Sequence, residues 1–268
     1  MSCSLPPEIL DLIAEHLRDE PATLKTCCVI DKSWVPRTRR HLFAHVEFRG
    51  LDLHVERWKK TFPDPSNSPA HYTHSLAIVG FPVVTAADTD AGGWIHTFHN
   101  VIHLRFECLR WEDHPTSLVP FYGLSPTVRS LRITSIFSGV FDFVCSFPFL
   151  EDLALVFYGP ERGVDGWNAP SASPKLTGSL DLRMAMRGTR STIRRLLDLP
   201  NGLYFTKVTM SCLSGDFESA TDLVSACSGT LESLTVVNWV VGAFPSASMV
   251  GQYLTVPYRR RHVRDALD

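Results

Sequence analysis

A short pattern of apolar residues recurs along most of the chain. Each copy reads apolar-x-x-apolar-x-apolar, or at least its last three positions. Alternation with a period of two is typical of a β-strand. The central residues of the copies are Leu76, Leu104, Leu131, Leu153, Leu180, Val208 and Leu234. Successive central residues lie 28, 27, 22, 27, 28 and 26 positions apart, and strands at such even spacing indicate a repeat architecture.

Segments with helical spacing of apolar residues lie between these strands. The clearest covers 216–227, where Asp216 is a suitable N-cap and Gly229 follows the end. A strand, a turn and a helix in each unit resembles the leucine-rich repeat, whose parallel strands line a concave face and whose helices cover the convex face. The Asn or Cys that this family places after each strand is missing, so irregular curvature is expected, with loops such as 159–174 bulging out. A globular α/β sheet with crossover helices is the alternative.

The N-terminal 43 residues have a different periodicity, which predicts three short helices. The first helix begins after a Pro pair, and its apolar residues cover a broad face that includes Ile9, Leu12 and Ile13. The second covers about 23–30, and the third begins at Ser33. About 40 residues bury too little surface to be stable alone. We therefore expect a partner to cover this module.

The same segment resembles an F-box, the three-helix motif by which substrate adaptors dock on the Skp-type linker of a cullin-based ubiquitin ligase. The family begins Leu-Pro-x-Glu followed by two apolar residues, which the run 5–10 matches, and it has an apolar-x-Lys-x-Trp signature, which 30–34 matches. The run from Trp34 to Phe43 is similar to the fungal F-box-like proteins. Asp31 stands where the family usually has Ser or Cys. An acid there either weakens docking or faces solvent.

This resemblance implies a non-enzymatic substrate adaptor of an SCF-type ligase, which binds the Skp-type linker, through it a cullin, and a target protein. No cofactor or metal is implied, nor is binding to nucleic acid or membrane. The implied linker-binding residues are Leu5, Pro6, Ile9, Leu10, Ile13, Leu17, Leu24, Ile30 and Trp34. The alternatives are a protein-binding repeat scaffold outside a ligase and an enzyme that uses His96 or His103 as acid or base across the repeats.

The fold class expected from these patterns is α+β or α/β, with an F-box followed by an irregular leucine-rich-repeat-like solenoid. The expected parts are the F-box-like domain (1–46), a helix and Pro-rich linker (47–70), the repeat domain (71–241) and a C-terminal tail (242–268). The tail is expected to be partly disordered and to add one more strand around Leu254 and Val256.

Charged residues occupy alternate positions within several predicted strands. Side chains on a strand point to opposite faces in turn, so residues between the buried positions lie on the concave side. A charge buried without a partner is costly, which means that these residues face solvent or a ligand. The candidate target-binding face consists of Arg105, Glu107, Arg132, Asp181, Arg183 and Lys207.

Composition narrows the function further. The net charge is −2, which offers no bulk attraction to nucleic acid or membrane. The seven cysteines are odd in number and mostly lie in apolar runs, as in proteins of a reducing compartment, so the cytosol or nucleus is expected. No phosphate-binding glycine loop, Gly-x-Ser-x-Gly motif or Cys-x-x-Cys pair occurs. His96, His99, His103 and Cys108 lack a carboxylate at ligand spacing. The basic run 259–264 is interpreted as a solvated end, with a nuclear-import or phosphate-binding patch as the alternative.

Overall fold

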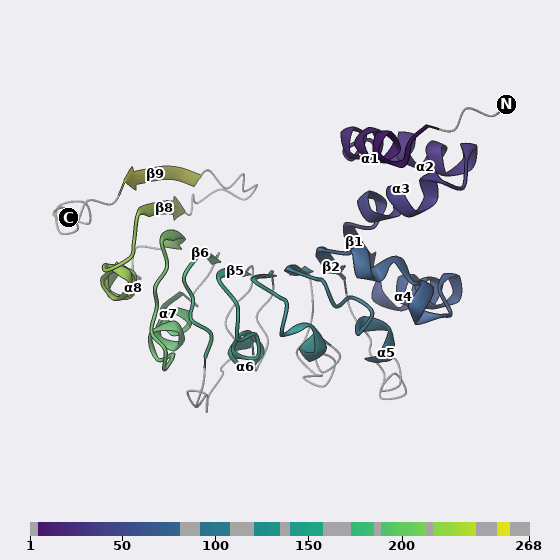
Figure 1. The fold of residues 1–268 in the computed structure, drawn as a ribbon. Helices are drawn as coiled ribbons and strands as arrows, with labels where there is room; N and C mark the ends of the chain where they lie inside the picture. The colour runs from purple at the N-terminus through teal and green to yellow at the C-terminus, as the bar shows by residue number, and fades with distance from the viewer. Residues whose placement is uncertain are drawn as a thin grey trace, which may run out of the picture.

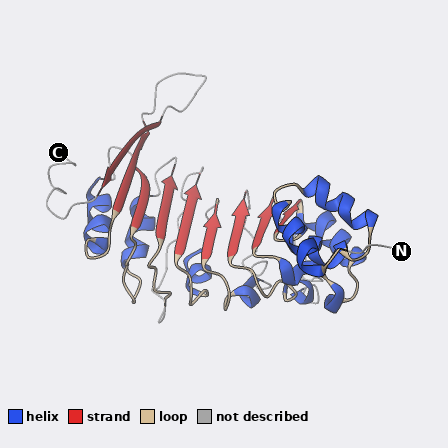
Figure 2. Ribbon diagram, turned by 45° about the horizontal axis from the view of Figure 1, so that its top comes forward, coloured by secondary structure: helices blue, strands red, loops and turns tan. Residues whose placement is uncertain are grey.

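The computed structural model describes residues 5–80, 92–107, 121–134, 140–157, 173–184, 189–212, 217–239 and 251–257. These residues form a mixed α/β structure around one open sheet (Figures 1 and 2). Its described strands stand side by side in chain order, and the first eight are parallel, while β9 is antiparallel to β8. They are β1 (His45–Arg49), β2 (Ser75–Val79), β3 (His103–Glu107), β4 (Ser130–Ile133), β5 (Asp152–Phe157), β6 (Ser179–Met184), β7 (Lys207–Cys212), β8 (Ser233–Trp239) and β9 (Gly251–Pro257).

The register of the sheet places the central residues of the repeated sequence pattern in one row. The row runs through Val46, Leu76, Leu104, Leu131, Leu153, Leu180, Val208, Leu234 and Val256. The seven predicted strands and the additional strand in the tail are therefore confirmed. β1 was not predicted, and the rest of the tail, with its basic run 259–264, lies outside the described residues.

The helices that connect the strands lie along one face of the sheet (Figure 1). They are α4 (Leu51–Thr61), α5 (Gly92–Ile95), α6 (Val140–Cys145), α7 (Thr189–Leu197) and α8 (Phe217–Cys227). Crossovers between parallel strands are right-handed. When each new strand is added on the same side, this handedness places every connecting helix on the same face. The described residues place no such layer of helices on the opposite face, and the strands curve around it.

The core fills the space between the sheet and these helices. One continuous cluster of buried side chains runs from Phe48 on β1 to Leu231 just before β8. Phenylalanines fill its middle, where Phe106 meets the rings of Phe121 and Phe143 edge to face at 5.1 and 5.6 Å. Aromatic pairs prefer this geometry. Each strand and helix depends on its neighbours for burial, because the core crosses every unit.

A repeated hydrogen-bond pattern fixes the start of each parallel strand. The carbonyl of Ala44 accepts the N–H groups of both His74 and Ser75 at 3.0 Å. The same double acceptance recurs at the carbonyls of His74, Ile102, Arg129, Gly178 and Thr206, each time from two successive residues of the next unit. At the remaining step, Glu151 accepts only from Gly178, and the Asp152 carboxylate accepts the second N–H, that of Ser179, at 2.6 Å.

Threonine side chains reinforce several of these junctions. The hydroxyl of Thr73 donates to the carbonyl of Phe43 at 2.9 Å, that of Thr206 to Gly178 at 3.2 Å and that of Thr230 to Phe205 at 3.1 Å. Buried backbone carbonyls need such partners. Backbone N–H groups and threonine hydroxyls thus satisfy these carbonyls. In the leucine-rich-repeat family, asparagine side chains bond to the backbone between strands.

The N-terminal helices α1 (Pro7–His16), α2 (Pro21–Ile30) and α3 (Trp34–Leu42) form a separate helical module. α3 packs against both other helices. The inward residues Leu10, Ala14, Leu24 and Cys27 are buried, but they are not part of the core cluster of the sheet. The module has its own small core.

Phe43 joins the helical module to the sheet. Its ring meets Trp58 of α4 and Phe62, the residue that follows α4, edge to face at 5.9 and 6.0 Å. The sheet begins at β1, which crosses the boundary predicted between the F-box-like domain (1–46) and the helix and linker segment (47–70). The proline-rich part of that segment forms two short 3₁₀ turns, η1 (Pro65–Asn67) and η2 (Pro69–Tyr72), and Ser68 between them is buried.

Gly178→Ala tests the exceptional junction before β6. A Cβ at this position would lie 2.5 Å from Asp152 Oδ1, too close for unstrained contact. We expect a loss of about 1–3 kcal/mol in the free energy of unfolding, measured by urea denaturation. Gly229→Ala is the matched control, because a Cβ there meets nothing within 4 Å. Equal midpoints for the two variants would contradict this account.

Candidate functional site

The helical module exposes a group of large apolar side chains. Leu5, Ile9 and Leu12 are 52, 41 and 66% exposed. Leu5 lies just before α1, and the spacing of Ile9 and Leu12 places them on one side of that helix. Val29 and Ile30 at the end of α2 are 87 and 72% exposed. Scattered exposed leucines are ordinary, whereas contiguous exposed apolar patches are typical of interaction sites. No described part of the chain covers these five residues.

The residues implied by the F-box resemblance fall into three groups in the structure. Leu5, Pro6, Ile9 and Ile30 are exposed, whereas Ile13, Leu17 and Trp34 are half-buried. Leu10 and Leu24 are buried in the core of the module, where they stabilise it and offer no surface to a partner. Leu12 and Val29 were missing from the implied set, although both belong to the apolar pattern of the module.

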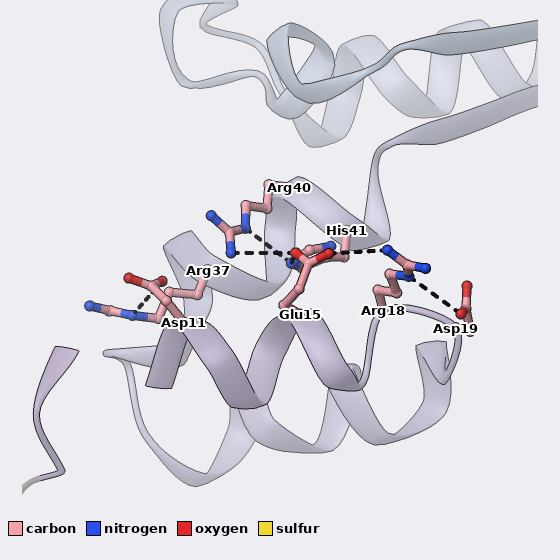
Figure 3. A network of polar contacts seen from close by, with 7 residues as sticks. All are labelled: Asp11, Glu15, Arg18, Asp19, Arg37, Arg40 and His41. Carbon is pink, nitrogen blue, oxygen red and sulfur yellow. Dashed lines mark hydrogen bonds and ion pairs between the residues drawn. The ribbon is translucent and has the colours of Figure 1, made fainter. Parts of the chain in front are cut away.

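Ion pairs fix α1 against α3 (Figure 3). Asp11 pairs with Arg37 Nε at 3.1 Å. Glu15, one turn later, lies 3.8 Å from Arg40, 3.6 Å from His41 and 3.2 Å from Arg18. Exposed pairs of this kind each contribute little. Their value is orientation, because they hold the polar side of α1 on α3 and so leave Ile9 and Leu12 on the outside.

The contacts between α1 and α3 also shift the pKa of His41. Its side chain is largely buried, and burial lowers its pKa, with a further decrease from the neighbouring Arg40 and Arg18 charges. Glu15 acts in the opposite direction and does not outweigh burial. The folded module therefore favours neutral His41.

Asp31 lies in the turn between α2 and α3 and is exposed. Its carboxylate accepts the N–H of Ser33 at 2.7 Å, directly before α3. This hydrogen bond lowers the pKa of Asp31. The acid at this position faces solvent and stabilises the turn, and a serine hydroxyl could accept the same bond.

The open face of the sheet carries the predicted charged residues. Arg105 on β3 lies 3.4 Å from Glu47 on β1 and 3.3 Å from Glu107 on its own strand. In the register, Ala77 of β2 lies between Glu47 and Arg105. The small alanine leaves room for this ion pair to cross the intervening strand.

A second pair crosses the sheet in the same manner. Arg132 on β4 lies 3.8 Å from Asp181 on β6, and Ala154 of β5 stands between them in the register. Asp181 also pairs with Arg183 at 2.8 Å. Lys207, at the start of β7, is exposed. The structure thus brings five of the six candidates into two clusters, β1–β3 and β4–β6, and places Lys207 outside both.

The first cluster contains two residues that were not predicted. Glu47 and Arg49 of β1 pair with each other, and Glu47 also pairs with Arg105. Both were missed because β1 was not recognised as a strand. The alternation His45, Glu47, Arg49 around Val46 and Phe48 was the available signal.

Comparison of the chain with protein-family models, with curated proteins and with solved structures found no match. None of the described helices is long and apolar enough to cross a membrane. Function must therefore be argued from the two surfaces themselves.

The histidines and cysteines are the remaining candidates for a metal site or a reactive thiol. No three His, Cys, Asp or Glu side chains gather there as a metal site requires. His96, His99 and His103 are exposed, and Cys108 lies outside the described residues. Burial raises the pKa of Cys145 to about 12 and that of Cys227 to about 11, so both thiols are protonated at neutral pH.

Substitutions of the charged residues on the open face should have little effect on the stability of the sheet. Arg132→Gln and Asp181→Asn each remove one charge of an exposed pair, so we expect each to change the free energy of unfolding by less than about 1 kcal/mol. Leu131→Ala is the control on the same strand, because it empties a buried position and should cost about 2–5 kcal/mol. Urea denaturation measures all three. Charge variants as damaging as Leu131→Ala would show that these pairs hold the sheet together.

Acidification should weaken the helical module through His41. Because its folded pKa lies below the unfolded value, the unfolded chain binds the proton more tightly. The stability contributed by neutral His41 is complete above about pH 6.5 and is lost as the pH falls below it. His41→Gln should therefore lose less stability between pH 7.5 and 5.5 than the wild type does, as measured by urea denaturation. His16→Gln, at an exposed position on α1, should keep the wild-type loss; identical losses in all three proteins would exclude His41 as the cause.

Proposed function

We propose that this protein is a substrate adaptor of an SCF-type cullin ubiquitin ligase. The helical module docks on a Skp-type linker as an F-box does, and the open sheet face captures the target protein. The observation that carries the proposal is the exposed apolar group on the module, Leu5, Ile9, Leu12, Val29 and Ile30. A partner that covered this group would stabilise the complex by burying it.

The construction of the module supports a docking role. Its core is small and separate from that of the sheet, and α1 is held by polar contacts with its apolar side outward. A three-helix unit that served only to close the end of the sheet would direct these residues toward β1. The module instead contacts the sheet unit through Phe43 and the end of α3.

The sheet supports a leucine-rich-repeat-like interpretation. Parallel strands in chain order, a connecting helix on one face and a repeated junction before each strand are the features of such solenoids. This topology leaves a charged, concave face open over β1–β6. Charges fixed on neighbouring strands favour specific partners through complementary placement.

The relative positions of the helical module and the open sheet face are also compatible with an adaptor. The helical module lies at the N-terminal end of the sheet, away from most of the concave face (Figure 1). A linker on α1 and α2 and a target on β3–β6 would thus occupy different parts of the molecule. An adaptor needs no catalytic residues of its own, because it acts by holding the target near the ligase subunits that do the chemistry. The free cysteines Cys27, Cys28, Cys145 and Cys227 agree with work in the cytosol or nucleus.

Leu5→Asp and Ile9→Asp test the docking surface. Each places a charge within the exposed apolar group of the helical module, so we expect co-purification of a Skp-type linker with the full chain to be lost. Both residues are exposed, which means that the circular dichroism and urea midpoint should stay close to those of the wild type. Phe149→Asp is the matched control, because Phe149 is exposed just before β5, far from the module, and it should bind the linker normally.

The outcome distinguishes adaptor from scaffold. If the wild-type chain binds no Skp-type linker, the remaining interpretation is a binding scaffold outside any ligase. Linker binding that survives both α1 variants would show that docking does not use this helix.

A further inference from the structure

A groove of about 480 Å³ lies at the free edge of the sheet, between β1, the end of α3 and α4. Its apolar wall consists of aromatic rings that support one another: Trp58 meets Phe43 at 5.9 Å and Phe48 at 5.6 Å, both edge to face. Phe62 completes the wall, with its ring 4.9 Å from that of Trp58. These contacts form the groove before anything enters it.

The backbone of β1 turns unpaired groups toward this groove. Ala44 and Gly50, at its two ends, bond to the β2 side, where the Ala44 carbonyl accepts from Ser75 and the Gly50 N–H donates to Val79. In a parallel ladder alternate residues face the same neighbour. His45, Glu47 and Arg49 therefore direct their N–H and C=O groups outward.

One of these outward groups already has a partner. The N–H of Arg49 donates to His54 Nδ1 of α4 at 3.2 Å. For the outward backbone groups of His45 and Glu47, the described residues supply none. Unpaired strand edges of this kind accept another strand.

The charge of the groove is positive. Glu47 is neutralised by Arg49 and Arg105. Arg57 of α4 lines the groove, is exposed, and has no acidic partner among the described residues. A second copy of this chain would bring the same cation to the same place, so charge disfavours edge-to-edge pairing of two copies. A ligand with a carboxylate complements the site.

We propose that this groove binds an extended peptide that adds a strand to the edge of β1. Side chains two positions apart on an added strand share one side. On the side of α4, an apolar residue of the peptide packs on the aromatic wall, and an acidic residue two positions away pairs with Arg57. Main-chain hydrogen bonds to His45 and Glu47 give affinity, while the wall and the cation select the sequence. The site does not depend on how the helical module docks.

Selection of peptides on the full chain tests this proposal. Phage-displayed random seven-residue peptides are selected on the immobilised wild-type protein, and synthetic copies are measured by fluorescence polarisation. We expect an enriched apolar-x-acidic pattern. Arg57→Glu should weaken these peptides by roughly tenfold or more, and Lys60→Glu, on the same helix but outside the groove, should change affinity by less than about twofold.

Two further measurements identify the mode of binding. N-methylation of a selected peptide at the amides that face β1 should abolish binding if the peptide adds a strand, whereas methylation of the alternate amides should not. A copy with Lys in place of the acid should regain affinity for Arg57→Glu. No enrichment, or equal affinity for the wild type and Arg57→Glu with both proteins folded, would overturn the proposal. So would a dimer in sedimentation that Arg57→Glu dissociates, because the occupant would then be a second copy.

Discussion

The common register of the eight parallel strands is the constraint on which the rest of the structure depends. It holds the row from Val46 to Leu234 on the helix side and the row that contains Glu47, Arg105 and Arg132 on the open side. A slip of one residue at any junction would exchange these rows. Guanidinium groups would then enter an apolar core, which is far more costly than any single ion pair is favourable. Double acceptance by one carbonyl fixes this register locally at six of the seven parallel junctions, and the Asp152 carboxylate completes the seventh.

This constraint also produces the surfaces. Because each right-handed crossover advances in the same direction, the helices cover one face only and the other stays open. Strands in chain order leave two ends. β9 pairs with β8 at the C-terminal end, while no described strand pairs with the outer edge of β1 beside α4. The open face and the edge groove are thus consequences of one topology, and the helical module is an addition at the N-terminal end.

Much of the sheet could be predicted from the sequence, because apolar alternation at even spacing depends on burial that every unit shares. β1 was not predicted, because Val46 and Phe48 are its only apolar pair and the proline-rich run after α4 suggested a domain boundary. Within α1 the sequence could not separate the buried Leu10 from the exposed Leu12, since apolar residues occupy two sides of that helix. In the structure, Leu10 and Ala14 are buried in the module, while Asp11 and Glu15 pair with α3 and leave Leu12 exposed.

Two ion pairs of the open face could not be predicted from the sequence for another reason: each joins strands that are not neighbours. Glu47 reaches Arg105 over Ala77, and Arg132 reaches Asp181 over Ala154, which spans two strand spacings, roughly 10 Å. The face is therefore neutralised locally, and net charge cannot attract a target strongly. A protein that binds there has to replace these pairs with charges at the same spacing. Under the proposed function, recognition of a target would depend on the placement of a few charges, and a target with the right total charge but the wrong spacing would be rejected.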